Sequence, residues 1–199
     1  YGVDLEKYAR RSRPKAGNQI IFGTVARLVD QKGHEFLLEA IPKVKQQFPH
    51  ARWQFVGDGY KREELEQKTR ALDIQDVVEF LGQQSDITTH LARFDAFILP
   101  SLWEGFPNVL LEAMAAALPV LATSVDGTVE LVVHDETGLL VAKENPDMLS
   151  RAMLRLLRQP HLMRWFGAAG RERVVGSFSL QKQIAEFEQL YDRLLEQKK

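Results

Sequence analysis

Residues 96–112 read AFILPSLWEGFPNVLLE and give the clearest indication of the fold class. This stretch begins with a wholly apolar run over residues 96–99, turns at Pro100, and enters a helix after Pro107. An apolar strand that leads directly into a helix is typical of a parallel sheet covered on both faces. In such sheets ligands bind at the carboxyl ends of the strands, so we expect the functional residues there.

The same alternation of apolar runs and helical periodicity continues on both sides of this stretch. It predicts strands at 20–26, 52–56, 77–81, 96–99, 120–122 and 138–141. It predicts helices at 32–47, 60–72, 87–93, 108–117, 146–158, 161–175 and 180–196, with a short helix after the turn at 123–130. The fold class is therefore α/β, a doubly wound, Rossmann-like parallel sheet with extra C-terminal helices. The last helix carries an apolar stripe and should pack against something: Ile184, Phe187, Leu190, Tyr191 and Leu194.

Composition and charge narrow the function classes. The chain has 199 residues, enough for one domain at 18–199, with the polar and basic residues 1–17 interpreted as a linker outside the core. Its 26 Lys and Arg nearly balance 27 Asp and Glu, so no global positive field favours nucleic acid. The chain has no cysteine and no apolar run of membrane-spanning length, and we expect a soluble, cytoplasmic domain.

The turn after the first strand is a candidate anion site. Residues 23–33 read GTVARLVDQKG and place Arg27 and Lys32 five residues apart, ahead of a helix. Two cations beside free N–H groups and the positive end of a helix dipole suit a diphosphate. An equally weighted alternative is that both cations are solvated loop residues and Gly33 only eases a turn.

The turn after the strand at 96–99 is a second candidate. Glu104 precedes the helix and Glu112 lies in its second turn, so both carboxylates should face one volume. Pro107 suits the first helical turn, which would leave the N–H groups of Val109 and Leu110 directed at the crevice. Carboxylates there could accept hydrogen bonds from the hydroxyls of a sugar and a ribose. Taken alone, Glu112 is better explained as an ordinary early-helix residue favoured by the dipole.

A third turn and several exclusions complete the pattern. Residues 123–130 aim another helix start at the same edge, and Asp126 is interpreted there as a helix cap. The segment 57–59, GDG, lacks the third glycine of a dinucleotide fingerprint because Arg62 stands in its place, which argues against a nicotinamide cofactor. The histidines lack ligand spacing and no Asp-x-Asp triplet occurs, so we expect no metal and no other cofactor. Those histidines are His34, His50, His90, His134 and His161.

Together these segments resemble one family, the retaining, metal-independent glycosyltransferases of the GT-B fold, glycosyl transferases group 1 type (family 4). The marks are GTVARLVDQKG, EGFPNVLLE with seven residues between its glutamates, DGTVELV and TGLLV, in order over nearly the whole chain. The opening YGVD resembles the hinge between the two halves of such enzymes. Asp126 stands where the family often has a second glycine, which puts the close backbone approach at that turn in doubt.

The resemblance implies roles for these residues. Arg27 and Lys32 would hold the diphosphate of a nucleotide-diphosphate sugar, Glu112 the ribose hydroxyls, and Glu104 hydroxyls of the transferred sugar. The base would rest near Leu81 and Gly82, with UDP or GDP as carrier. Backbone contacts would come from the loop and helix start: Gly105, Phe106, Pro107, Asn108, Val109 and Leu110. Arg27, Lys32 and Glu104 would act in catalysis, in which the acceptor hydroxyl attacks from the face that the diphosphate leaves.

The resemblance also implies an N-terminal acceptor domain that these residues do not include. We therefore expect donor binding with little transfer by this chain alone. The full enzyme would pass a hexosyl group to a glycan or lipid-linked glycan in polysaccharide biosynthesis, and any contact with the inner membrane would come through the other half. The alternatives are a degenerate half-domain that binds nucleotide sugars or partners without catalysis, and a phosphorylase or epimerase that shares the fold.

Overall fold

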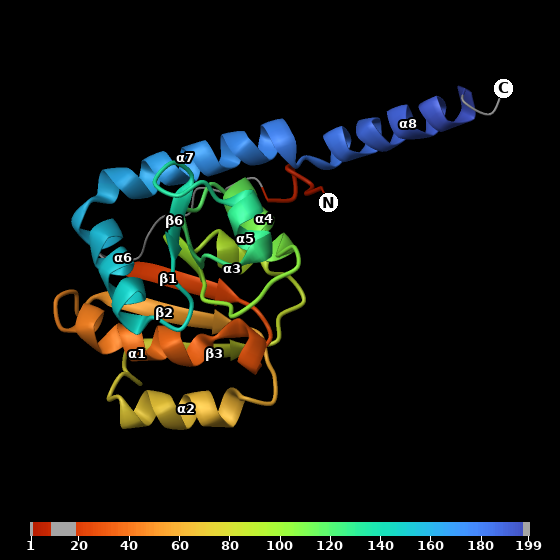
Figure 1. Cartoon of the computed structure of the whole chain (residues 1–199). Helices are drawn as coiled ribbons and strands as arrows, with labels where there is room; N and C mark the ends of the chain where they lie inside the picture. Colours follow the sequence, from red (N-terminus) through yellow and green to blue (C-terminus); the bar gives the residue numbers. More distant parts are fainter. Residues whose placement is uncertain (1, 9–18, 197–199) are drawn as a thin grey trace.

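The computed structural model describes residues 2–8 and 19–196, which form one α/β domain around a single parallel sheet (Figure 1). Its six strands lie in the order β3-β2-β1-β4-β5-β6. The strands are β1 Ile20–Val25, β2 Ala51–Val56, β3 Val78–Gly82, β4 Ala96–Leu99, β5 Val120–Thr123 and β6 Gly138–Val141. The predicted doubly wound sheet is confirmed, with strand ends within one residue of those expected. The basic residues Arg10, Arg11 and Arg13 of the predicted linker lie outside the described residues.

Eight α-helices and one 3-10 turn connect and follow these strands in the described part of the chain. They are η1 Asp30–Lys32, α1 His34–Lys45, α2 Arg62–Ala71, α3 Thr88–Leu91, α4 Asn108–Ala115, α5 Asp126–Leu131, α6 Pro146–Arg158, α7 Pro160–Ser177 and α8 Leu180–Glu196. Local signals fix several boundaries. At α6, for example, Asn145 accepts a hydrogen bond from the N–H of Met148 at 2.9 Å, and Pro146 follows it in the first turn.

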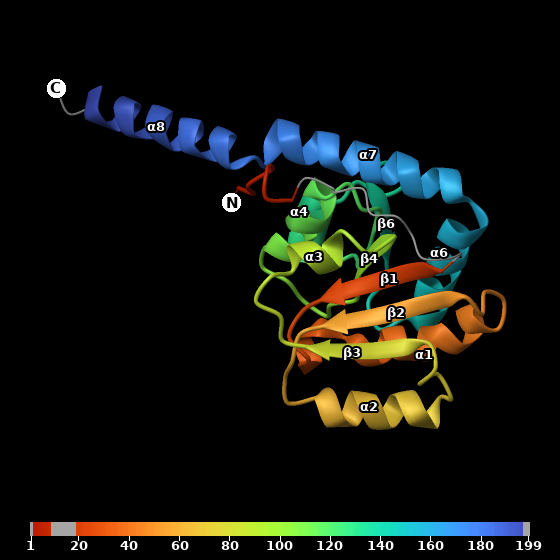
Figure 2. The same ribbon diagram turned by 180° about the vertical axis from the view of Figure 1, so that it is seen from behind.

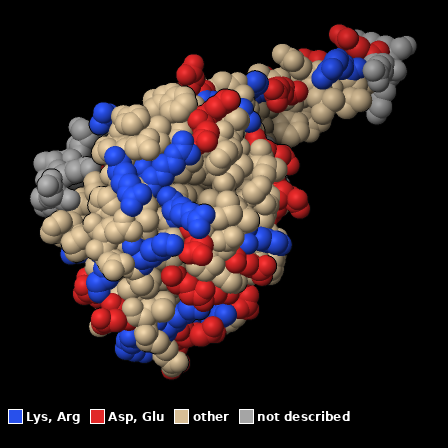
Figure 3. Space-filling model, turned by 60° about the vertical axis from the view of Figure 1, so that its left-hand side comes forward, with Lys and Arg blue, Asp and Glu red and all other residues tan. Residues whose placement is uncertain are grey.

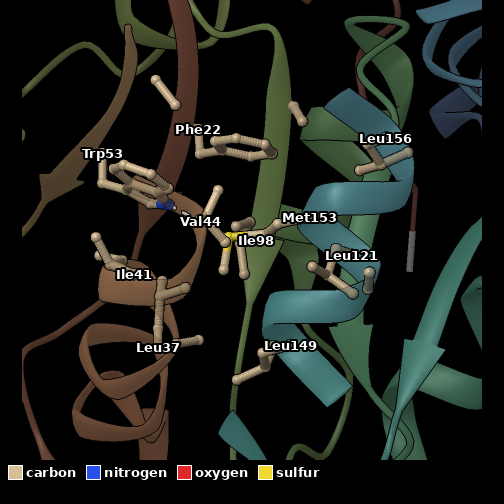
Figure 4. Packing of buried hydrophobic residues seen from close by; sticks show 14 of the residues in the cluster. Phe22, Leu37, Ile41, Val44, Trp53, Ile98, Leu121, Leu149, Met153 and Leu156 are labelled. Atoms are coloured by element: carbon tan, nitrogen blue, oxygen red, sulfur yellow. Dashed lines mark hydrogen bonds between the residues drawn. The ribbon is translucent and has the colours of Figure 1, made fainter. Parts of the chain in front are cut away.

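The core lies on both faces of the sheet. The strands β4 and β5 are buried at every position, as central parallel strands must be. On one face α1 and α6 pack together over Phe22, Trp53 and Ile98 (Figure 4). There the Trp53 indole N–H donates to Met153 Sδ at 3.3 Å. On the other face α4 and α7 pack together.

The chain order creates one switch point in the sheet. From β1 the chain moves outward through β2 to β3, and from β4 it moves outward in the opposite direction through β5 to β6. The strands β1 and β4 are neighbours, with Phe22 aligned to Ala96. The loops that follow these two strands therefore diverge to opposite sides, which opens the crevice where ligands bind in such sheets.

The N-terminal segment of the described chain lies at the α7–α8 junction, where Val3 pairs with Ser179. Figures 1 and 2 show α8 running away from the domain beyond α7, with the N-terminal segment beside the junction. None of the α8 residues is buried, so the predicted apolar stripe lies exposed on the helix. The interpretation of residues 1–17 as a linker outside the core is wrong for Val3 and Tyr8. These side chains are 5% and 7% exposed and join the core on the α4 face.

The surface carries charges of both signs. Figure 3 shows Lys and Arg side chains grouped on one face with Asp and Glu close beside them. Within the described residues no helix is both long enough and apolar enough to cross a bilayer.

Candidate functional site at the β1–β4 switch point

An ion pair joins the loops that follow β1 and β4. Lys32 Nζ lies 2.5 Å from Glu104 Oε1, and the Ser101 hydroxyl donates to the same oxygen at 2.6 Å. Glu104 is 8% exposed, so its charge is stabilised by these two partners more than by water. The structure thus brings together two residues that the sequence placed at the same rim. Ser101 was missed, although a serine two residues after the end of a buried strand is a signal for this position.

Backbone contacts hold the two loops in register. Gly33 has φ +58, and a Cβ there would lie 2.3 Å from the Pro100 carbonyl oxygen, so only glycine fits. The Leu102 N–H donates to the Gln31 carbonyl at 2.8 Å, and the Gln31 side chain donates to the Trp103 carbonyl at 3.0 Å. The geometry of the ion pair is therefore set by the loops before any ligand binds.

The loop after β2 braces the β1–α1 loop from the other side. The Asp30 carboxylate accepts from Lys61 Nζ and from the Tyr60 hydroxyl, each at 2.7 Å. The hydrogen bond from Lys61 lowers the pKa of Asp30, and the same bond raises the pKa of Lys61. A Cβ on Gly57 would lie 1.9 Å from the Ala26 carbonyl oxygen. The glycines that open like a dinucleotide fingerprint thus serve close packing between two loops.

A buried histidine anchors the backbone at Arg27. His34 is 1% exposed, and its Nε2 lies 3.1 Å from the Arg27 carbonyl oxygen, so Nε2 carries the proton that is donated. Burial lowers the pKa of His34 to about 4 and keeps the ring neutral. The sequence showed only that the histidines lack ligand spacing, and it did not predict this contact. The Arg27 side chain itself is exposed, and no carboxylate among the described residues pairs with it.

The low pKa of His34 predicts acid sensitivity. An imidazole with a pKa of about 4 when folded and about 6.5 when unfolded contributes stability above pH 6.5 that is lost as pH falls toward 4. Between pH 7 and pH 5 this group should lower the free energy of unfolding by about 2 kcal/mol. Urea unfolding at both pH values measures this effect. Between pH 7 and pH 5 the free energy of unfolding of His34→Gln should fall by about 2 kcal/mol less than that of the unmodified chain.

The exposed His50 supplies the matched control, because its side chain faces solvent. His50→Gln should lose as much stability between pH 7 and pH 5 as the unmodified chain. Equal pH dependence of His34→Gln and the unmodified chain would show that His34 is not buried as a neutral ring.

The start of α4 differs from the prediction at two residues. Pro107 is the N-cap, with ψ 92, so its place in the first helical turn was wrong by one position. The Leu110 N–H donates to the Pro107 carbonyl at 2.9 Å. Contrary to the prediction, this N–H is therefore not available to a ligand. Asn108 and Val109 occupy the first two helical positions, where the N–H groups have no acceptor within the helix. These two groups are the anion donors that the helix start offers.

The loop before α4 is shaped by a close approach of backbones. The Gly127 N–H donates to the Glu104 carbonyl at 3.2 Å, and a Cβ on Gly127 would lie 2.1 Å from the Gly105 carbonyl oxygen. The close approach at this turn is therefore present with a single glycine. The centroid of the Phe106 ring lies 6.2 Å from that of Phe178, whereas a Cβ on Gly105 would meet nothing within 4 Å.

The interpretation of Asp126 as a helix cap is wrong. The N-cap of α5 is Val125, and Asp126 is the first helical residue and is exposed. The turn is closed by Thr128, whose hydroxyl accepts from the Val125 N–H at 3.1 Å and donates to the Thr123 carbonyl. Thr128 is fully buried and replaces the predicted cap from inside the fold.

The remaining predicted site residues, Glu112, Leu81 and Gly82, lie outside the loops that carry the Lys32–Glu104 ion pair. Glu112 is partly buried in α4, and it accepts a hydrogen bond from the Tyr8 hydroxyl at 2.7 Å, a partner that the sequence did not predict. Leu81 and Gly82 end the edge strand β3, and the Gly82 carbonyl accepts from the Gly57 N–H at 2.8 Å. Because β3 is two strands from β1, the end of β3 lies about 10 Å along the rim from the end of β1. An extended ligand can reach across this distance.

The groups at this rim have the chemistry that suits phosphate oxygens. They are the Lys32 ammonium, the Arg27 guanidinium and the two N–H groups at the start of α4. Within the described residues no group of three or more metal-ligating side chains occurs. The carboxylate of Glu104 adds an acceptor for hydroxyl groups next to these donors.

The comparisons with known proteins converge on one family. Residues 6–173 match the model of the family described as Glycosyl transferases group 1. The chain is 28% identical over 202 residues to the UDP-Gal:alpha-D-GlcNAc-diphosphoundecaprenol alpha-1,3-galactosyltransferase of Escherichia coli. That alignment covers 96% of this chain and 52% of the relative, so the chain spans about half of that enzyme.

Solved structures have the same fold. HepE from Anabaena, crystallised in complex with UDP, superposes with a TM-score of 0.85 at 25% identity over 94% of this chain and 56% of its own. The C-terminal domain of the glycosyl transferase group 1 family protein LpcC from Francisella tularensis has a TM-score of 0.79 at 24% identity. The match covers 90% of this chain and 100% of that domain.

Proposed function

The chain belongs to the family Glycosyl transferases group 1, and on that premise we propose that it is the donor-binding domain of a retaining glycosyltransferase. Its ligand would be a nucleoside-diphosphate sugar. The observation that carries the proposal is the ion pair between Lys32 and Glu104 at the switch point of the sheet. It couples a cation suited to the diphosphate with a carboxylate suited to the sugar.

Charge supports the assignment of the diphosphate. Two negatively charged phosphates need compensation, and this rim supplies Arg27, Lys32 and the N–H groups of Asn108 and Val109. As the glycosidic bond breaks, negative charge grows on the departing diphosphate. Donors that are held at that position would stabilise the charge without reorganisation. The proposal therefore needs no metal ion and no other cofactor.

The contact between Lys32 and Glu104 suggests how the site accommodates its ligand. In the free protein Lys32 neutralises the buried carboxylate of Glu104. When the diphosphate binds, Lys32 acquires a second anionic partner, and the carboxylate of Glu104 becomes a stronger acceptor for sugar hydroxyls. The acceptor hydroxyl then attacks the anomeric carbon from the face that the diphosphate leaves, which retains the configuration.

The relatives favour a uridine nucleotide. The Escherichia coli relative is named for UDP-Gal, and HepE was crystallised with UDP and with UDP-glucose. We propose UDP-hexose as the donor class, with the base near Leu81 and Gly82 and the ribose hydroxyls on Glu112. The role of Glu112 fits its place one helical turn beyond Asn108 at the start of α4.

Transfer would require a second, acceptor-binding half. The chain spans about half of the Escherichia coli relative and of HepE. The exposed apolar stripe of α8 offers a face for that half to cover, with Ile184 at 49%, Phe187 at 49% and Leu194 at 48% exposure. We propose a glycan or lipid-linked glycan as acceptor, bound mainly by the other half, so this chain alone should bind donor with little turnover.

Replacing Glu104 separates the sugar from the nucleotide. Glu104→Gln should weaken UDP-glucose binding by about 1.5 kcal/mol, because a charged acceptor of sugar hydroxyls is lost. It should leave UDP binding unchanged or stronger, because Lys32 no longer shares its charge with a carboxylate. Isothermal titration calorimetry with UDP, UDP-glucose and GDP measures both effects and the preference for the base.

Glu39→Gln is the matched control, since Glu39 lies in the middle of α1 and pairs with Lys68 on the surface. It should change neither affinity. If the unmodified chain binds no nucleotide, the proposed function is wrong. If Glu104→Gln weakens UDP and UDP-glucose equally, the assignment of Glu104 to the sugar is wrong.

A further inference from the structure

The N-terminal segment, residues 2–8, is docked on the junction between α7 and α8. The Val3 N–H donates to the Phe178 carbonyl at 2.9 Å, and the Leu180 N–H donates to the Val3 carbonyl at 3.0 Å. Asp4 closes the following turn by accepting from the Lys7 N–H at 3.2 Å. A Cβ on Gly2 would lie 2.7 Å from the Leu180 Cα, so the two backbones are in tight contact. These bonds fix the place at which Tyr8, the residue after Lys7, enters the domain.

Tyr8 carries this segment to the candidate ligand site. Its side chain is 7% exposed, and its hydroxyl donates to Glu112 Oε1 at 2.7 Å across 104 residues of sequence. Burial, together with the bond to Glu112, raises the pKa of Tyr8, so the hydroxyl remains a proton donor at physiological pH. The Tyr8 hydroxyl can therefore donate to Glu112 throughout the physiological pH range.

The bond leaves part of the Glu112 carboxylate available. Among the described residues Tyr8 is the one donor to this carboxylate, and it uses only Oε1. A cavity of about 250 Å³ lies beside the pair, lined by both residues together with Lys7, Asn108 and Leu180. The second oxygen can thus accept hydroxyl donors, while Tyr8 removes the freedom of the carboxylate to rotate toward other partners.

We propose that Tyr8 is a positioning residue for the ribose of the bound nucleotide, acting through Glu112. This inference rests on the proposed function, in which Glu112 receives the ribose hydroxyls. It adds that nucleotide affinity is linked to the docking of residues 2–8 on the α7–α8 junction, because Tyr8 belongs to that segment. By thermodynamic linkage, a nucleotide on Glu112 in turn stabilises the docked segment.

Tyr8→Phe tests the role by removing only the hydroxyl while the ring keeps its place in the core. UDP affinity, measured by calorimetry on the full 199-residue chain, should fall about fivefold to tenfold. The affinity for 2′,3′-dideoxy-UDP, which has no ribose diol, should stay within about twofold of the unmodified chain. In a Glu112→Gln background, Tyr8→Phe should add little, because both changes remove the same interaction.

Tyr191→Phe is the matched control, because Tyr191 is 62% exposed on α8 and should leave every affinity unchanged. If the unmodified chain binds UDP and Tyr8→Phe binds it equally well, the role of Tyr8 is refuted while the proposed function stands. Equal losses for UDP and its dideoxy analogue would also refute it, since they indicate a general structural effect. If the unmodified chain binds no nucleotide, both proposals fall.

Discussion

Replacing Lys32 by alanine should weaken UDP binding by about 1.5 to 3 kcal/mol, the range for a hydrogen bond to a charged group. Two effects act in the same direction. The diphosphate loses a cation, and the carboxylate of Glu104, which is 8% exposed, is left without its ion-pair partner beside incoming negative charge. Isothermal titration calorimetry of UDP with the two proteins gives the difference directly.

Lys43→Ala is the matched control, because Lys43 pairs with Asp147 on the surface near the far end of α1 and should not affect UDP. A double variant separates the two effects at Lys32. Adding Glu104→Gln to Lys32→Ala should recover part of the lost affinity, since the unpaired carboxylate is removed. Unchanged affinity of Lys32→Ala would remove Lys32 from the phosphate site.

Replacing Gly33 by alanine should destabilise the fold by about 2 to 3 kcal/mol. The new Cβ would force a side chain into the left-handed region at φ +58 and would lie 2.3 Å from the Pro100 carbonyl oxygen. The loops after β1 and β4 must then separate, so the Lys32–Glu104 contact should be lost as well. Urea unfolding measures the stability, and calorimetry with UDP measures the damage to the site.

Gly176→Ala provides a control of the opposite sign. Gly176 lies in α7, and a Cβ there meets nothing within 4 Å. Alanine is the better helix former, so this variant should gain about 0.5 kcal/mol and keep its affinity for UDP. If Gly33→Ala is as stable as the unmodified chain, the close approach of the two loops is not required by the fold.

Features that depend on residues close together in the sequence were predicted well, and features that depend on distant contacts were not. Apolar runs and helical periodicity gave the strands and helices within one to three residues, because both depend on neighbours along the chain. The errors at Pro107 and Asp126 are local shifts of one position, caused by a loop whose shape depends on contacts with residues elsewhere in the sequence. At the α5 turn, for example, the buried Thr128 hydroxyl takes the place of an Asp126 cap.

The amino-acid pattern alone predicted the parallel sheet, which the structure confirms. It also predicted a ligand-binding edge and the charged residues there, and that part stays a prediction. Both predictions were possible because strand patterning, glycine and proline positions, and charge are properties of nearby residues. Only the tertiary structure decided which of those residues are partners: Lys32 with Glu104 across 72 positions, and Tyr8 with Glu112 across 104. Such pairs form only when segments that are distant in the sequence pack together. That packing depends on the buried contacts of the whole domain and not on the residues near either partner.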